Sequence, residues 1–79
     1  MKARIIVTPR REVLDPQGEA VRLGLHALGY GEVSGVRVGR YIELDVGGDA
    51  SQARARVAEM CDRLLANGVI EDYSFSLEP

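Results

Sequence analysis

The sequence is poor in the residues that most often carry catalysis or metal binding. Among 79 residues there are one cysteine, one histidine and no tryptophan, and aromatic residues make up only 5%. A single cysteine cannot form an internal disulfide, and no cluster of cysteine and histidine predicts a metal site. Positive charge is not in excess either, since the net charge is −2. The composition therefore argues against a nucleic-acid phosphate backbone as a partner.

Long apolar segments are also missing. The apolar runs are a few residues long, too short to span a bilayer, and the first residues lack the apolar segment and cleavage site of a secretory signal. We therefore expect a cytoplasmic protein without a membrane partner. Hydrophobic residues make up 46% of the chain, which predicts one folded domain over residues 1–79. A core this small buries only about 60–65% of the unfolded surface, so oligomerisation is a common supplement.

The central residues 36–46 predict a hairpin of two short strands. Apolar side chains alternate with polar ones in both halves: Val36 and Val38, then Ile42, Leu44 and Val46. Directly opposed residues of an antiparallel pair share a face, so a three-residue connection at 39–41 suits this pattern. The resulting register pairs Val38 with Ile42, Val36 with Leu44, and Arg37 with Glu43. One face then serves the core, and the other carries an opposite-charge pair.

A strand and a helix flank this hairpin on each side. Residues 3–9 predict a strand that ends at Pro9, and Asp15 followed by Pro16 predicts a helix start. The inward stripe of this helix is Val21, Leu25 and Leu28. A second helix follows Asp49 or Ser51 and stops at 67–68, and residues 72–78 predict the last strand. The order predicts an α+β, ferredoxin-like βαββαβ sandwich, with a four-stranded antiparallel sheet and both helices on one face.

Few residues suggest chemistry of their own. His26 lies away from the apolar stripe of its helix, so we expect a surface histidine. Cys61 lies on the apolar stripe of the second helix, which predicts a buried and inert thiol. Arg10 and Arg11 lie in a loop without a glycine-rich phosphate-binding pattern. No catalytic, cofactor-binding or metal-ligating residue is predicted, and the exposed pair Ile6 and Tyr41 on the outer sheet face favours contact with protein.

Three stretches together resemble the PurS family. They are residues 13–18 (VLDPQG), residues 36–44 (VRVGRYIEL) and residues 60–73 (MCDRLLANGVIEDY). PurS is the small subunit of phosphoribosylformylglycinamidine (FGAM) synthase, an ATP-dependent, glutamine-hydrolysing ligase of purine biosynthesis. The resemblance implies a non-catalytic homodimer, or a dimer of dimers, that bridges a glutaminase subunit and a synthetase subunit and assists ammonia transfer between them. ATP and magnesium are expected on the synthetase subunit, and no cofactor on this chain.

The resemblance also directs attention to two sets of candidate contact residues. For self-association the candidates are Ile6, Arg37, Arg40, Tyr41 and Glu43. For docking of the larger subunits they are Arg10, Arg11, Asp15, Gln17, Asn67, Glu71, Asp72 and Tyr73. Two other readings of the fold remain open at this point. One is a ferredoxin-like regulatory domain that binds a small molecule, and the other is an acylphosphatase-like enzyme, which lacks a well-placed asparagine.

Overall fold

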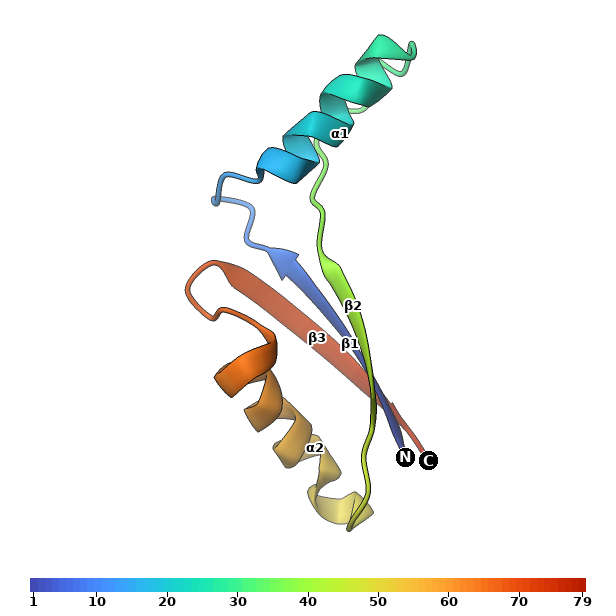
Figure 1. Ribbon diagram of the computed structural model, residues 1–79, viewed down its shortest axis with the longest axis vertical. Helices are drawn as coiled ribbons and strands as arrows, with labels where there is room; N and C mark the ends of the chain where they lie inside the picture. Colours follow the sequence, from blue (N-terminus) through green and yellow to red (C-terminus); the bar gives the residue numbers. More distant parts are fainter.

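The computed structural model describes residues 1–79 and contains three strands and two α-helices, the second of which continues into a π-helical turn (Figure 1). In chain order these are β1 (Lys2–Pro9), α1 (Pro16–Ala27), β2 (Arg40–Asp45), α2 (Ala50–Met60), the π-helical turn η1 (Cys61–Leu65) and β3 (Glu71–Glu78). Neither α-helix has the length and apolar character that a membrane crossing requires.

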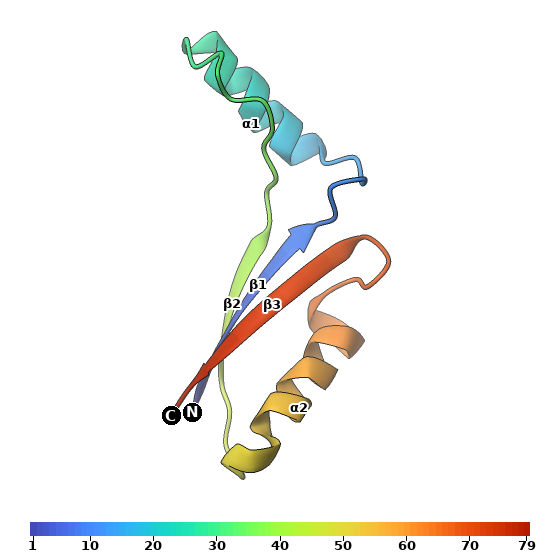
Figure 2. The ribbon, with the colours of Figure 1, turned by 180° about the vertical axis from the view of Figure 1, so that it is seen from behind.

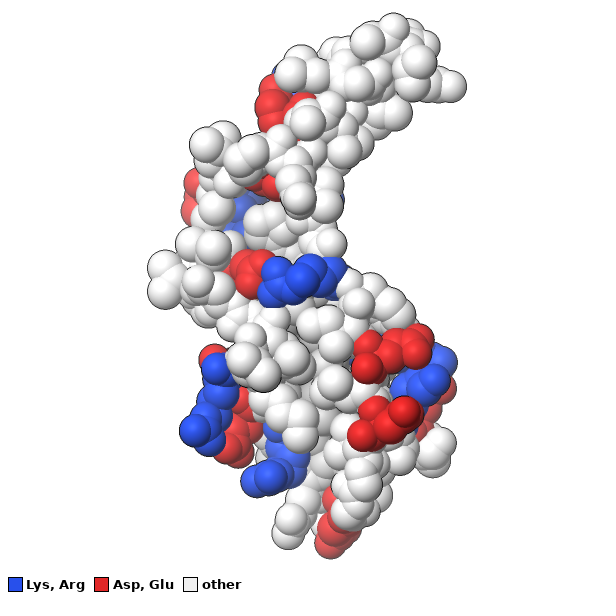
Figure 3. All heavy atoms as spheres, in the orientation of Figure 1, with Lys and Arg blue, Asp and Glu red and all other residues white.

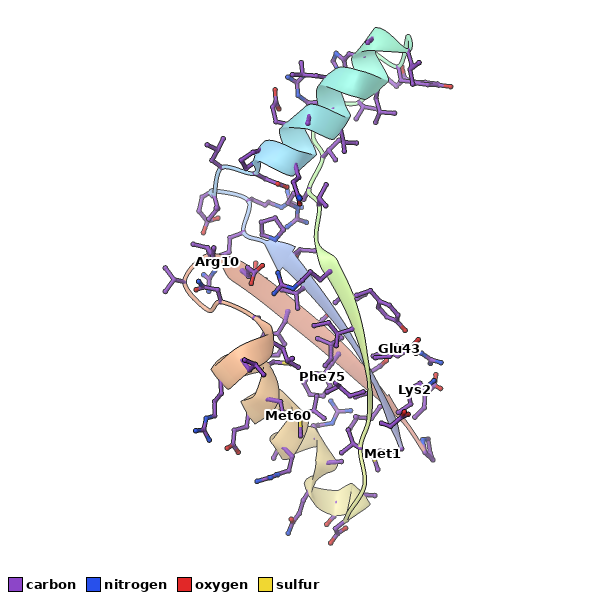
Figure 4. The ribbon with its side chains drawn as sticks, in the orientation of Figure 1. Met1, Lys2, Arg10, Glu43, Met60 and Phe75 are labelled. Carbon is purple, nitrogen blue, oxygen red and sulfur yellow. The ribbon has the colours of Figure 1, made fainter.

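The sheet has the order β2-β1-β3, with both neighbours antiparallel to β1. The registers place Ile5 opposite Ile42 on one side and opposite Phe75 on the other. These three side chains share a face because side chains that are directly opposed point to the same side. That face is covered by α2, and Phe75 lies between the sheet and this helix, as does Met60 (Figure 4). The other face has no helix over it.

The core is small and lies between β1 and α2. Only eight residues are buried, and the largest that are fully buried are Ile5, Val7, Val57 and Cys61. Val57 in α2 and Cys61 in η1 are separated by about one helical turn, so both lie on the side of the helix that faces the sheet. The prediction of a buried Cys61 is therefore confirmed.

The fold places α1 away from this core. The helix and the extended chain that returns from it, residues 16–39, project beyond the end of the sheet as an arm (Figures 1 and 2). The molecule consequently measures 50 × 25 × 14 Å. Asp15 holds the base of the arm, because its carboxylate accepts from the backbone N–H groups of Gly18 (3.0 Å) and Val38 (2.9 Å). At the far end His26 Nε2 lies 2.6 Å from the carbonyl oxygen of Val33.

The predicted four-stranded sheet with two helices on one face is wrong for this chain. The structure has a three-stranded sheet, and residues 36–38 form no strand with β2. The chain runs straight from 36 to 45, so that within the chain Val38 is not opposite Ile42 and Arg37 is not opposite Glu43. The predicted turn fails at Gly39, whose φ is not positive, since positive φ occurs only at Gly29 and Gly48.

Close approach, not a turn, explains the glycine at position 39. A Cβ atom there would lie 2.2 Å from the carbonyl oxygen of Val7, because the extended chain continues alongside the end of β1. A hairpin pattern and a continuous strand have the same alternation of side chains. The packing of this glycine, which depends on a distant strand, decides between them.

Most of the other local predictions are confirmed. β1 ends at Pro9, α1 starts after the capping Asp15 with Pro16 in its first turn, and α2 starts after Asp49. β3 begins one residue before the predicted strand, at Glu71. His26 is exposed, as expected.

Candidate functional site

The loop after β1 and the turn before β3 come together at the base of the arm. The Arg10 backbone N–H donates to Ile70 O at 2.9 Å, and its guanidinium donates to Gly68 O at 2.6 Å. The same guanidinium lies 3.6 Å from an Asp72 oxygen, close enough for an ion pair and too long for a hydrogen bond. Residues 9–18 and 67–73, predicted separately as docking segments, therefore form one surface, which we call the neck surface; Arg10 lies there beside the start of β3 (Figure 4).

Several predicted docking residues are occupied in holding this surface together. The Glu71 carboxylate accepts from the Arg40 guanidinium at 2.7 and 3.0 Å and from the Asn67 N–H at 2.8 Å. The guanidinium, and then this N–H, hold the pKa of Glu71 below its ordinary value, and the carboxylate raises the pKa of Arg40. Arg40 also donates to Leu65 O at 2.7 Å, which ties β2 to the end of η1.

Two further docking candidates have defined partners as well. The Tyr73 hydroxyl donates to an Asp62 oxygen at 3.0 Å, and this bond raises the pKa of the tyrosine. The pKa of Asp15 is lowered by the backbone N–H of Val38 and next by that of Gly18. Arg11 and Gln17, in contrast, are exposed and make no side-chain hydrogen bond. Arg11 borders a cavity of about 450 Å³ with residues 35–37.

The neck surface also carries apolar side chains that the sequence reasoning missed. Leu14 is 84% exposed and Val69 is 82% exposed, and Ile70 beside it is 42% exposed. Exposed leucine or valine is ordinary when it is scattered, but these residues lie on the two segments that Arg10 joins. Their signal in the sequence is weak: each lies outside a periodic helix or strand, directly beside a helix cap or stop.

The outer sheet face brings together only part of the predicted self-association set. Ile6 and Tyr41 are paired across β1 and β2, and they are 52% and 57% exposed. The Tyr41 hydroxyl donates to Glu43 at 2.9 Å, and Lys2 lies 3.5 Å from the same carboxylate. The hydroxyl and then Lys2 lower the pKa of Glu43, whereas burial, followed by this carboxylate, raises the pKa of Tyr41.

The two arginines of that set lie elsewhere. Arg37 donates to Pro9 O at 3.1 Å, beyond the end of β2, and Arg40 points towards Glu71. Figure 4 shows Glu43 and Lys2 on the side of the sheet away from α2. The outer face therefore offers a small apolar pair within a charged surround, while the two arginines belong to the base of the arm.

A third surface lies along the free side of β2. Two adjoining cavities, of about 540 and 400 Å³, open between this strand and α2, and both are lined by Leu44, Arg56 and Met60. We call them together the β2–α2 groove. Leu64, which is 83% exposed, borders one of them. No group of three or more histidine, cysteine, aspartate or glutamate side chains is placed to hold a metal ion.

These surfaces define a small α+β protein with three exposed regions suited to contact with other chains. The chain belongs to the PurS family: the family model described as "Phosphoribosylformylglycinamidine (FGAM) synthase" matches residues 2–79. The recognition made from the three motifs, including the assignment to a subunit of this ligase, is thereby confirmed.

Curated relatives agree along nearly the whole chain. The phosphoribosylformylglycinamidine synthase subunit PurS of Bacillus subtilis is 46% identical over 77 residues, which cover 98% of this chain and 92% of the relative. The subunit of the same name from Synechocystis is 53% identical over 75 residues, covering 94% of this chain and 75% of the relative.

Solved structures share the fold as well. A B. subtilis PurS structure matches with a TM-score of 0.88 at 45% identity and covers 99% of this chain and 98% of its own. A chain in "Structure of PurLQS from Thermotoga maritima" matches with a TM-score of 0.81 at 32% identity, covering 95% of this chain and 93% of its own.

Proposed function

We propose that this chain is the non-catalytic small subunit of an FGAM synthase complex, where it bridges a glutaminase subunit and an ATP-dependent synthetase subunit. The observation that carries the proposal is the full-length family match, over residues 2–79. The relative seen in the PurLQS structure of T. maritima supports assembly with larger subunits. ATP and magnesium are assigned to the synthetase subunit and no cofactor to this chain.

The neck surface is our candidate for docking a larger subunit. Exposed apolar residues at the centre of a surface, surrounded by charged groups, are typical of protein interfaces. Leu14 and Val69 supply the apolar part here, and Arg11 and Asp72 supply exposed charge of both signs. Because Arg10 bonds the two segments to each other, the surface is already formed in the free subunit, and docking needs little further ordering.

Assistance in ammonia transfer is the mechanistic part of the proposal. Ammonia released by the glutaminase is protonated and diluted when it reaches solvent. Holding the two active sites in one assembly raises the local concentration of ammonia at the second site and excludes water from its path. A subunit can supply this effect through contacts alone, without a nucleophile or a general base of its own.

Self-association belongs to the same proposal. An 8.6 kDa chain with eight buried residues has little core of its own, so a homodimer, and further a dimer of dimers, provides additional apolar burial. On the outer sheet face Ile6 and Tyr41, with Glu43 beside them, remain the candidate contact between copies.

Binding of the two larger subunits to neck variants tests the proposed function. Leu14→Asp and Val69→Asp place a charge where an apolar contact is expected, so each should weaken binding at least tenfold in a titration followed by sedimentation. Ala55→Asp, at an exposed position on α2, is the matched control and should bind as wild type does. Equal binding by all three variants would exclude the neck surface, and no binding by wild type would exclude the proposed function.

A further inference from the structure

The part of the neck surface that projects furthest from the core is the turn at residues 67–70, which we call the tip. All four of its residues are exposed, and Val69 is 82% exposed. Ala66, directly before the tip, is buried, and Glu71, directly after it, is half-buried. Apolar packing therefore does not hold the tip in place, and its position depends on hydrogen bonds.

The bonds within the tip start from one residue, Asn67. Its carbonyl oxygen accepts from the N–H groups of Ile70 at 3.1 Å and of Glu71 at 2.7 Å. Its side-chain oxygen accepts from the N–H of Val69 at 3.0 Å. These local bonds give the turn its shape, but they do not fix its direction relative to the sheet. That direction depends on bonds to other segments of the chain.

An arginine on each side connects the tip to the sheet. Arg10, in the loop after β1, bonds the carbonyl oxygens of Gly68 and Ile70. On the other side Arg40, the first residue of β2, bonds the carboxylate of Glu71. The tip is therefore held between two guanidinium groups that come from different segments.

The Arg40 guanidinium has acceptors on two elements at once. It donates to both Glu71 carboxylate oxygens, at 2.7 and 3.0 Å, and to Leu65 O at 2.7 Å, at the end of η1. One of the Glu71 oxygens also accepts from the Asn67 N–H at 2.8 Å, which continues the connection into the tip. Figure 3 shows basic and acidic atoms side by side at the base of the arm, where this ion pair lies. The planar fork of arginine suits such a set of acceptors, whereas a lysine ammonium is a single point of charge.

The stability of the fold accounts for little of this arrangement. The Arg40 side chain is 49% exposed, and ion pairs of exposed arginines contribute little to the free energy of unfolding because water screens them. The bonds instead restrict a segment that has little packing of its own. A partner that binds a loose segment must first order it, and this ordering lowers the affinity.

We infer that Arg40 is a positioning residue for docking, which holds the tip, and with it Val69, in the shape that a larger subunit binds. This inference rests on the proposed function and deepens it, because it names a residue that acts on docking through Glu71 and the end of η1. Arg40 was a candidate for self-association in the sequence, and its bonds give it this separate role at the neck surface.

A double-mutant cycle in the docking titration tests this role. Arg40→Lys keeps the charge but loses the fork, and Val69→Ala removes an exposed apolar side chain from the tip. Each change alone should weaken binding of the larger subunits, and Arg40→Lys should do so about tenfold, because the loosened tip must be ordered on binding. The two changes together should weaken binding by less than the product of the single effects, because Val69 has no defined place in a loosened tip.

Leu14 provides the matched control for the cycle. This leucine is also exposed on the neck surface, but it lies in the loop that begins at Arg10 and makes no bond to Arg40. The effects of Arg40→Lys and Leu14→Ala should therefore multiply. An Arg40 that only stabilised the fold as a whole would affect the cycles with Val69 and with Leu14 alike, so a difference between them reports positioning.

Amide hydrogen exchange of the free chain gives a second readout that needs no partner. The Asn67 N–H should exchange about tenfold faster in Arg40→Lys than in wild type, whereas the N–H groups of β1 should be unchanged. Wild-type exchange at Asn67, wild-type docking by Arg40→Lys, or effects that multiply in both cycles would each overturn the inference. Failure of the proposed function is seen separately, as absence of binding by the wild-type chain itself.

Discussion

The Leu28→Ala variant tests whether Leu28 stays exposed to solvent or is buried in an interface between two copies. This side chain is 74% exposed on α1 in the single chain, so its replacement should alter the stability of an isolated monomer by less than about 0.5 kcal/mol. If a second copy covers this side of α1 in the proposed homodimer, the exposed part becomes buried. Full burial of a leucine contributes about 1.5–3 kcal/mol, so each chain loses roughly 1–2 kcal/mol of dimer stability.

The two-fold symmetry doubles that loss to roughly 2–4 kcal/mol per dimer, which raises the dimer dissociation constant about 30- to 1,000-fold. Sedimentation equilibrium over a range of concentrations measures it. Leu14→Ala is the matched control, because that leucine is 84% exposed but lies on the neck surface, and its dimer should be unchanged. An unaltered dissociation constant for Leu28→Ala would show that this leucine lies outside the interface between copies.

Three further perturbations test other parts of the structure. Gly39→Ala places a Cβ atom 2.2 Å from Val7 O and should lower the free energy of unfolding, measured in urea, by about 1–3 kcal/mol. Gly31→Ala, with open space around it, should lower it by less than about 1 kcal/mol. Equal losses for the two variants would contradict the close approach of Gly39 to Val7. Arg40 and the Asn67 N–H hold the pKa of Glu71 below its ordinary value of 4.5, so the carboxylate stabilises the fold above that pH, and this effect is lost as pH falls through the lower pKa of the folded state. Glu71→Gln should therefore make the free energy of unfolding depend less on pH in acid, and an unchanged pH dependence would count against the Arg40–Glu71 contact. Tyr41→Asp adds a second acid beside Glu43 on the outer face and should weaken self-association of the chain, measured by sedimentation at micromolar concentration. Unchanged sedimentation would exclude this face as a contact between copies.

Local signals in the sequence were sufficient for the helix starts and for two of the strands. Asp15 followed by Pro16 is a cap whose geometry depends on its immediate neighbours, and the alternation in 72–78 matches a strand with one side on the core. Cys61 was placed correctly because helical spacing alone puts it on the apolar side of its helix.

The path of residues 36–46 depended on contacts that no local pattern contains. The side-chain alternation is the same in a closed hairpin and in a continuous strand, so no local pattern could distinguish the predicted fourth strand from a straight continuation of β2. The straight path is held by Asp15, which bonds Val38, and by the approach of Gly39 to Val7. Both contacts join positions more than 20 residues apart in sequence.

The candidate contact residues were only partly identified from the sequence, for a related reason. The two docking segments were identified separately, but their union through Arg10 requires the end of β1 to lie beside the start of β3. Glu71 and Asn67 proved to be engaged in holding the turn. Leu14 and Val69 were missed because neither belongs to a periodic pattern, and exposure outside such patterns becomes visible only in three dimensions.

We propose that this chain links ammonia production to ammonia use without catalysing either. The most direct measurement compares amidine formation driven by glutamine with that driven by added ammonium, using the two larger subunits with and without this chain. The chain should raise the glutamine-driven rate at least tenfold and leave the ammonium-driven rate nearly unchanged. A glutamine-driven rate that is equally high without the chain would contradict it.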